Sequence, residues 1–198
     1  MSVLKSARET RLLCFLMLPV VLMLASCVGS TKKVAGTDTG EAGGKSQAGV
    51  REIKDYEIQL FDDSGALTKV KLSQAVGQGK VVVIDFWATW CGPCRQSIPD
   101  LVAMQQEYKD KGVQVFGLST EDPEDSKELV AGAAKSLKMT YKIGFVSREM
   151  FMSFTRSGTI PQCFVFGKDG KLVKQLTGFN PNISPRILRE AVDKALQS

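Results

Sequence analysis

The chain has 198 residues, of which 43% are hydrophobic, with five cysteines, no histidine and a formal net charge of +5. Without histidine, the chain cannot supply a Cys–His nucleophile, a Ser–His–Asp triad or a His-ligated zinc or copper site. Lysines and acidic residues are interspersed along most of the chain, which predicts a mixed-charge surface and gives little support to a nucleic-acid partner. We expect no metal and no bound cofactor.

Residues 1–26 have the pattern of an export signal. Lys5, Arg8 and Arg11 precede an almost wholly apolar stretch over 12–24, and small residues then lead to Cys27. The apolar stretch is shorter than the ~20 residues that comfortably span a bilayer. The pattern resembles a bacterial lipoprotein signal, in which cleavage before Cys27 leaves that cysteine to carry lipid. The alternatives are an uncleaved anchor, or an ordinary signal in which Cys27 is incidental, and both also put the remainder outside the cytoplasm.

The rest of the chain divides into a linker and one domain. Residues 27–50 are rich in Gly, Ser, Thr, Ala and Lys, which predicts a flexible tether because so few large apolar side chains cannot offset the entropy of ordering. Residues 51–198 have the size and apolar content of a single domain. Only Cys91, Cys94 and Cys163 belong to it, and one pair plus one odd thiol fits an exported redox protein better than a disulfide-stapled mini-fold.

Strands and helices alternate along the domain. Alternating patterns predict a hairpin over 56–61 and 67–72, and a continuous apolar run predicts a central strand over 81–86 that is buried on both faces. A helix over 91–111, with Pro99 kinking it, and a strand over 113–119 should follow. Asp122 and Pro123 then begin a helix whose inner face we expect to be Leu129, Val130, Ala133, Ala134 and Leu137.

The last third of the chain completes a three-layer α/β domain. We expect a strand over 141–146, a helix over 147–155 with Met150, Phe151, Met152 and Phe154 in its core, and a hairpin over 162–166 and 172–176. Ser184 and Pro185 should cap a final amphipathic helix, whose inner residues would be Ile187, Leu188, Ala191, Val192, Ala195 and Leu196.

The most informative motif is Cys91-Gly92-Pro93-Cys94, directly after the central strand. A strand that feeds into a helix places the first sulfur at the helix N-terminus, where free N–H groups and the helix dipole stabilise a thiolate. The second cysteine lies one turn later, close enough to form a disulfide with the first. Thiol–disulfide exchange is therefore the leading hypothesis.

The segment 86–95, Phe-Trp-Ala-Thr-Trp-Cys-Gly-Pro-Cys-Arg, together with the later Gly158-Thr159-Ile160-Pro161, resembles the thioredoxin superfamily, and more narrowly its exported, membrane-tethered TlpA/ResA type. The resemblance covers 51–198 and implies a thioredoxin-like fold with a central mixed sheet, an N-terminal hairpin and a helix–strand insertion near 122–146. It also implies a thiol–disulfide oxidoreductase, favoured as a reductase over an oxidase. Its partners would be cysteine-containing extracytoplasmic proteins, including apocytochrome c before haem attachment, and a membrane thiol reductant.

The resemblance assigns roles to the motif residues. Cys91 would be the exposed nucleophile and Cys94, more buried, would resolve the mixed disulfide. Gly92 and Pro93 would tune the potential, because they set how well the reduced thiolate is solvated. Pro93 also suits the first turn of a helix. Pro161 would be cis and pack beside the pair, and Ile160 would offer backbone groups to a partner segment. Trp90 would shield the sulfurs and contact partners, with plain packing as the alternative, whereas Trp87 is expected in the core.

Asp85 is a carboxyl inside an apolar strand, so burial should raise its pKa. Thioredoxin has an aspartate at the matching position, whereas many TlpA/ResA-type proteins have an amide there and an acid three residues after the second cysteine, where this chain has Ser97. We therefore expect Asp85 to exchange a proton with Cys94, the alternative being a carboxylate bonded to backbone. Cys163 should share a strand face with Pro161, as a buried small hydrophobe or as a third redox-active thiol.

Two other functions remain open. A peroxiredoxin-like thiol peroxidase is one, although the Pro-x-x-x-Thr/Ser-x-x-Cys pattern does not precede Cys91. A tethered binding or chaperone module, in which the groove by Pro161 holds extended segments, is the other.

Overall fold

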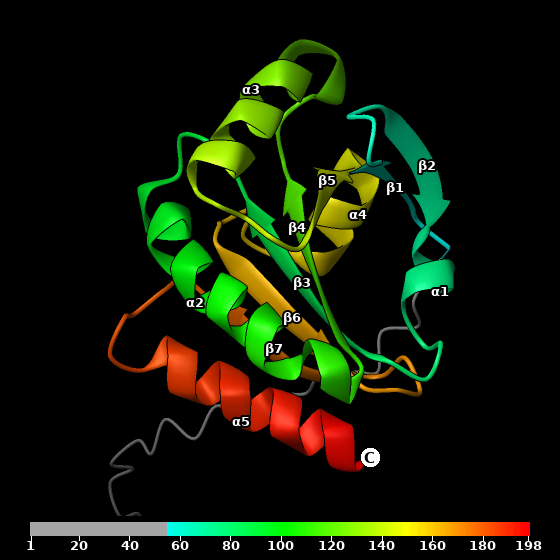
Figure 1. The fold of residues 1–198 in the computed structure, drawn as a ribbon, viewed down its shortest axis with the longest axis vertical. Coiled ribbons are helices and arrows are strands. Elements are labelled where there is room, and N and C mark those ends of the chain that lie inside the picture. The colour runs from blue at the N-terminus through cyan, green and yellow to red at the C-terminus, as the bar shows by residue number, and fades with distance from the viewer. Residues whose placement is uncertain (1–54) are drawn as a thin grey trace, which may run out of the picture. The chain divides into compact units, whose positions relative to one another are not determined.

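A computed structural model describes residues 55–198 of the chain (Figure 1). The predicted signal over 1–26 and the predicted tether over 27–50 lie outside the described residues, and so does Cys27. The described part of the predicted domain is an α/β fold around one mixed sheet of seven strands.

The sheet has the strand order β2-β1-β5-β4-β3-β6-β7. Its strands are β1 (Glu57–Phe61), β2 (Leu67–Lys71), β3 (Val81–Trp87), β4 (Val113–Ser119), β5 (Lys142–Val146), β6 (Gln162–Phe166) and β7 (Leu172–Thr177). The three strands β3, β4 and β5 run parallel, and the two hairpins, β1–β2 and β6–β7, pair antiparallel at either side of them. The sheet is therefore mixed, as expected.

Strand β3 is the centre of the fold. All seven of its residues are buried, because β4 and β6 flank it and helices cover both of its faces. Successive side chains of a strand point to opposite faces. Val83, Asp85 and Trp87 therefore share one face, and Ile84 and Phe86 point to the other. The strand leads directly into the loop that carries Cys91.

Helices form the outer two layers. They are α1 (Leu72–Ala75), α2 (Gly92–Tyr108), α3 (Pro123–Ser136), α4 (Arg148–Phe154) and α5 (Ser184–Gln197), with a 3₁₀ turn, η1 (Lys109–Lys111), after α2. Helices α2, α3 and α5 pack on the face that holds Val83 and Trp87, whereas α1 and α4 pack on the face that holds Ile84 and Phe86. Figure 1 shows α2 and α5 side by side on one face of the sheet. Because α1 and α4 cover the other face, the three-layer prediction is confirmed.

The predicted elements are confirmed with small differences at their ends. The helix predicted over 91–111 is α2 followed by η1, because the chain reaches Gly112 in the left-handed conformation, with φ of 82°. Ser184 is the first residue of α5 and not its cap: Ile183 occupies the cap position, and the Ser184 hydroxyl accepts from Asn180 N. The single turn α1 was not predicted.

One core prediction is wrong and one is only partly right. Leu129 on α3 is 58% exposed, whereas Val130 and Ala134 of the same helix are buried. Leu129 lies at the margin of the apolar stripe, so the sheet covers its neighbours and leaves it in solvent. On α4, Met150 and Phe154 are core residues as expected, but Met152 is 56% exposed.

Candidate functional site

The cysteine pair lies at the junction of β3 and α2. Cys91 and Cys94 form a disulfide with an S–S distance of 2.00 Å and a Cα–Cα distance of 5.3 Å. Cys91 is the N-cap of α2, and its sulfur accepts a hydrogen bond of 3.2 Å from the Cys94 backbone N–H. Gly92 and Pro93 form the first turn between the two cysteines, and both are exposed. The backbone donor at the helix N-terminus is thus aimed at the sulfur that the motif predicts as a thiolate.

Cys91 is more buried than expected, whereas Cys94 is buried as expected. Cys91 is only 4% exposed and Cys94 is fully buried, so the predicted order is right while the predicted exposure of Cys91 is wrong. Both cysteines belong to the apolar cluster beneath α2, which closes around the disulfide. The adjacent Trp90 has the opposite environment, with 71% of its surface exposed. Plain packing therefore does not explain Trp90, whereas Trp87, fully buried, is the core residue that we expected.

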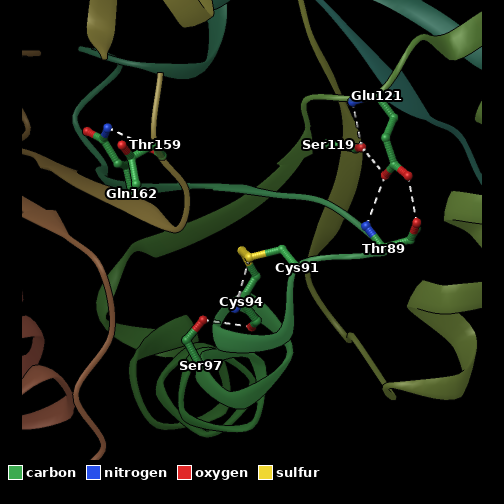
Figure 2. The surroundings of a disulfide bond; sticks show 8 residues. All are labelled: Thr89, Cys91, Cys94, Ser97, Ser119, Glu121, Thr159 and Gln162. Carbon is green, nitrogen blue, oxygen red and sulfur yellow. Dashed lines mark hydrogen bonds between the residues drawn. A yellow bond between two sulfur atoms is a disulfide. The ribbon is translucent and has the colours of Figure 1, made fainter. Parts of the chain in front are cut away.

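The loop before β6 lies at the same end of the sheet as the cysteine pair. The peptide bond between Ile160 and Pro161 is cis, as the resemblance implied. Phe86 is the register partner of Gln162, so the chain after β3 and the chain before β6 leave the sheet together. The Gln162 side chain donates to the Thr159 carbonyl at 2.9 Å, as Figure 2 shows, and a bond from Gln175 holds it at 2.7 Å. These bonds hold the loop at the end of the sheet from which the chain continues to the disulfide.

Asp85 is a buried carboxyl with no charged partner. It is 1% exposed, and its Oδ2 atom accepts no hydrogen bond from the residues that the structure describes. Burial raises the pKa of Asp85 from 3.8 to about 7. The alternative of a carboxylate bonded to backbone has no support at Oδ2. Asp85 shares a small cavity of about 30 Å³ with Ser97, one turn after Cys94, and with Pro161 and Cys163.

Ser97 and Cys163 line the same cavity as Asp85. The Ser97 hydroxyl donates to the Cys94 carbonyl at 2.8 Å, a bond within α2 that Figure 2 shows. Cys163 is the free cysteine of the described residues, and it lines the same cavity as Pro161, as expected for two residues on one strand face. Burial and the nearby Asp85 raise the pKa of the Cys163 thiol well above its ordinary value, so this thiol stays protonated.

A groove of about 720 Å³ opens next to the disulfide. Trp90, Gly158 and Ile160 line it, so it includes both segments predicted to contact a partner. The remaining lining comes from β1, from the ends of β4 and β5 and from the beginnings of α3 and α4, and includes Glu121 and Met152. The groove thus begins at Trp90, the residue directly before Cys91.

Sequence reasoning missed Glu121 and Thr89. The Glu121 carboxylate accepts a bond of 3.0 Å from Thr89 N and one of 2.6 Å from the Thr89 hydroxyl, as Figure 2 shows. A signal was present, since Glu121 comes two residues after β4 and Thr89 two residues after β3. Parallel neighbouring strands end at the same edge of a sheet, so the pairing of β3 with β4 brings the two positions close together.

Within residues 55–198, no group of three His, Cys, Asp or Glu side chains is placed to hold a metal ion. Among the helices in that range, none is both long enough and apolar enough to cross a bilayer.

Known proteins match most of the described domain. The sequence profile of the AhpC/TSA family matches residues 51–175. The thiol-disulfide oxidoreductase ResA of Bacillus cereus is 28% identical over 110 residues, 56% of this chain and 61% of that protein. The protein of the same name from Oceanobacillus iheyensis is 34% identical over 125 residues, 63% and 62% of the two lengths. The matched stretch thus spans less than two thirds of either relative.

Solved structures agree with the fold. A Chlorobium tepidum chain, assigned as a thiol:disulfide interchange protein DsbE, has 30% sequence identity and a TM-score of 0.59, and the match covers 72% of this chain and 95% of that chain. A second Chlorobium tepidum structure, of a thioredoxin family protein, has a TM-score of 0.55 at 22% identity and covers 73% and 99% of the two chains. The architecture is therefore thioredoxin-like, as the motif predicted.

Proposed function

Because this chain belongs to the AhpC/TSA family, we propose that it is a thiol–disulfide oxidoreductase that acts through Cys91 and Cys94. The observation that carries the proposal is the Cys91–Cys94 disulfide at the N-terminus of α2, next to the loop of Ile160 and Pro161. The names of the ResA relatives and of the DsbE structure support the same activity. The pair itself carries the electrons, so the reaction needs no other cofactor.

In the reductive direction, the Cys91 thiolate attacks one sulfur of a partner disulfide and releases the other partner sulfur as a thiolate. Cys94 then attacks the Cys91 sulfur, which releases the second partner thiol and closes the Cys91–Cys94 disulfide. Two electrons pass to the partner, and a dithiol donor must restore the pair. The Cys94 N–H that lies 3.2 Å from the Cys91 sulfur, together with the helix dipole, favours the attacking thiolate.

The second step needs an acceptor for the Cys94 proton, and Asp85 fits this role. Cys94 is fully buried, and in a site without histidine two carboxyls, Asp85 and Asp100, share a cavity with Ser97, one turn further along α2. Asp85 is the fully buried one of the two, whereas Asp100 is only partly buried. A carboxyl whose pKa is about 7 is half-ionised at neutral pH and can both take and return a proton. Thioredoxin has an aspartate at the position that matches Asp85, so the resemblance supports the same role here.

The groove beside the disulfide would hold the partner. Trp90 presents an exposed aromatic ring at its edge, and Ile160 lines it next to Pro161. Aromatic side chains provide large contact areas at low entropic cost, which suits recognition of an extended segment. Gly92 and Pro93, exposed at the start of α2, complete the surface that the partner would approach.

The cellular setting is proposed from the N-terminal sequence and from the resemblance. Residues 1–26 would be a lipoprotein signal, Cys27 the lipidated residue and 27–50 the tether that holds the domain outside a bacterial membrane. The substrates would be disulfides of extracytoplasmic proteins, with apocytochrome c as one candidate. A membrane thiol reductant would recharge the pair. Gly-Pro between the cysteines resembles reducing thioredoxins, which favours the reductase direction.

Trapping with Cys94→Ser, in the full-length exported protein, tests the activity. This variant can attack partners but cannot resolve the mixed disulfides, so covalent adducts that disappear on reduction should accumulate on Cys91. Cys91→Ser and Cys163→Ser are the controls: the first should abolish the adducts and the second should leave them. Absence of adducts, or a potential of the pair near about −120 mV as for a strong oxidant, contradicts the reductase proposal.

The two rival functions give different results in the same set of variants. A thiol peroxidase would consume peroxide faster than it exchanges with protein disulfides, and Cys91→Ser would abolish both. A binding module would retain its partners in Cys91→Ser. The absence of the peroxiredoxin sequence pattern before Cys91 favours exchange over peroxide chemistry.

A further inference from the structure

The loop between β3 and Cys91 is attached to the end of β4 by one carboxylate. Glu121 accepts two bonds from Thr89, at 3.0 Å from its N–H and at 2.6 Å from its hydroxyl, and a third of 2.9 Å from the Ser119 hydroxyl. Its own N–H donates to the same Ser119 oxygen at 3.1 Å. Hydrogen bonds to an ionised carboxylate are roughly twice as strong as bonds between neutral groups. Glu121 is thus a substantial constraint on the segment that precedes Trp90 and Cys91 (Figure 2).

The negative charge of Glu121 is not cancelled by its partners. All three donors are neutral groups, and no Lys or Arg among the described residues forms an ion pair with it. Arg95 lies in the first turn of α2, Asp85 is buried on β3, and Glu57, Asp122 and Arg148 line the same groove as Glu121, while residues 158–161 contribute no ionisable side chain. Glu121 also lines the groove next to Trp90 and Ile160.

From this geometry we propose that Glu121 is a positioning residue for Cys91, which fixes the Thr89–Trp90 segment and makes the pair more reducing through its charge. The proposal rests on the proposed function, because it requires Cys91 to be the thiolate of the reduced form. A like charge near a thiolate destabilises it, and destabilising the reduced form lowers the reduction potential. Glu121 thus makes two separate contributions: its hydrogen bonds hold the Thr89–Trp90 segment in place, and its negative charge acts on the Cys91 thiolate. Each contribution can be removed without the other.

Three variants separate the two contributions. Glu121→Gln removes the charge but keeps the shape, since its carbonyl can accept from Thr89 N and Ser119 while its amide donates to the Thr89 hydroxyl. Thr89→Val keeps the charge and removes one bond. Glu121→Ala removes both. Asp122→Asn is the matched control, because Asp122 is an acid of the same groove that caps α3 and not the Cys91 loop, and asparagine retains the cap.

The measurements are the equilibrium with glutathione, the thiolate absorbance of Cys91 against pH, and the hydrogen exchange of the Thr89 amide. Glu121→Gln should raise the equilibrium constant for reduction about three- to tenfold, equivalent to a potential about 15–30 mV less negative, and should move the Cys91 titration to lower pH. Thr89→Val should leave this constant within about twofold of the parent. In Glu121→Ala, the Thr89 amide should exchange about tenfold faster or more, because its acceptor is gone.

Specific outcomes overturn the proposal. If Asp122→Asn shifts the equilibrium as much as Glu121→Gln does, general groove charge and not Glu121 sets the potential. If Glu121→Gln shifts neither the equilibrium nor the Cys91 titration, the charge has no role. If Glu121→Ala fails to fold, Glu121→Gln and Thr89→Val still decide the question. Failure of the trapping experiment instead contradicts the proposed function, because the glutathione equilibrium does not depend on a protein partner.

Discussion

Asp85 on β3 and Cys163 on β6 are direct cross-strand partners at the centre of the sheet. On the other side, the β4 partner of Asp85 is Gly117, where the ring of Tyr141 occupies the space that a side chain would fill. Neither neighbouring strand gives Asp85 a positive charge, so burial alone raises its pKa to about 7. Burial raises the pKa values of Cys163 and Tyr141 well above their ordinary values, and the nearby Asp85 adds to both shifts.

The raised pKa of Asp85 predicts that the folded protein loses stability as the pH rises. The unfolded chain releases this proton near pH 3.8, whereas the folded chain holds it until about pH 7. Ionising Asp85 in the folded protein therefore lowers the free energy of unfolding. This loss is absent at low pH, grows between pH 3.8 and about pH 7, and is complete above about pH 7. At 1.36 kcal/mol per pKa unit, the full cost is about 4 kcal/mol.

Asp85→Asn should remove this cost because its side chain never ionises. Urea unfolding of the oxidised variant should show it more stable than the parent by about 4 kcal/mol at pH 8 and by less than about 2 kcal/mol at pH 5. Asp63→Asn, at an exposed position in the β1–β2 turn, is the control for the substitution itself and should change the free energy of unfolding by less than about 0.5 kcal/mol. A stability difference between Asp85→Asn and the parent that is equal at both pH values would contradict the raised pKa.

The same variant tests proton transfer during exchange. In the parent, the rate of resolution by Cys94 should rise as Asp85 ionises around pH 7, because the ionised carboxyl accepts the thiol proton. Asp85→Asn should be slower at neutral pH by about a hundredfold, the lower end for general acid–base catalysis, and should lose this inflection. The measurement is the stopped-flow rate, at a series of pH values, at which Cys94 resolves a mixed disulfide between Cys91 and a small thiol. An unchanged rate in Asp85→Asn would rule out the proton-transfer role.

Cys163 should behave as an unreactive thiol in the folded protein. Its pKa is raised by burial and by Asp85, so little of it is thiolate at neutral pH. In the oxidised protein, iodoacetamide should therefore modify Cys163 slowly, and denaturation should make the reaction fast. In the reduced protein, Cys91 should react first, and Cys163→Ala should lack only the slow phase. Cys163 modification as fast as that of Cys91 would favour a third redox-active thiol.

The two tryptophans should separate stability from partner recognition. Trp87 is fully buried and Trp90 is 71% exposed, although only two residues lie between them. Trp87→Ala should lower the free energy of unfolding by about 3–5 kcal/mol, as for other large core truncations. Trp90→Ala should change it by less than about 0.5 kcal/mol but lower kcat/KM for a protein disulfide about tenfold, while Trp90→Phe retains most activity. A normal kcat/KM in Trp90→Ala would contradict its place in the partner groove.

The elements whose sequence signal lies within a few consecutive residues were predicted well. The continuous apolar run of β3 and the Asp122–Pro123 start of α3 need no distant residue to be recognised, and both have the predicted form. The inner face of α3 depended on which part of the helix meets the sheet. Periodicity placed Leu129 and Val130 on one stripe, but only tertiary packing determines that the sheet covers Val130 and not Leu129.

The site was predictable only in part for the same physical reason. The cysteine motif is contiguous, and Pro161 could be assigned by resemblance. The bond between Thr89 and Glu121 joins residues 32 positions apart and depends on the pairing of β3 with β4, which a single sequence does not state. The near-complete burial of Cys91 likewise results from packing around the closed disulfide and not from any property of the motif.

Gly144 on β5 lets β1 of the N-terminal hairpin pack closely against the rest of the sheet. A Cβ atom at this position would lie 2.0 Å from the carbonyl oxygen of Gln59 on β1, so any side chain must push the two strands apart. Gly144→Ala should therefore destabilise the protein by about 3 kcal/mol or more, the upper range for overpacking, and should speed amide exchange in β1. Gly132→Ala on α3 is the matched control, because a Cβ atom at Gly132 would meet no atom within 4 Å. The higher helix propensity of alanine should raise the stability of this variant by up to about 1 kcal/mol. If chemical denaturation shows equal stability for both variants, β1 and β5 do not make the close contact that the register requires.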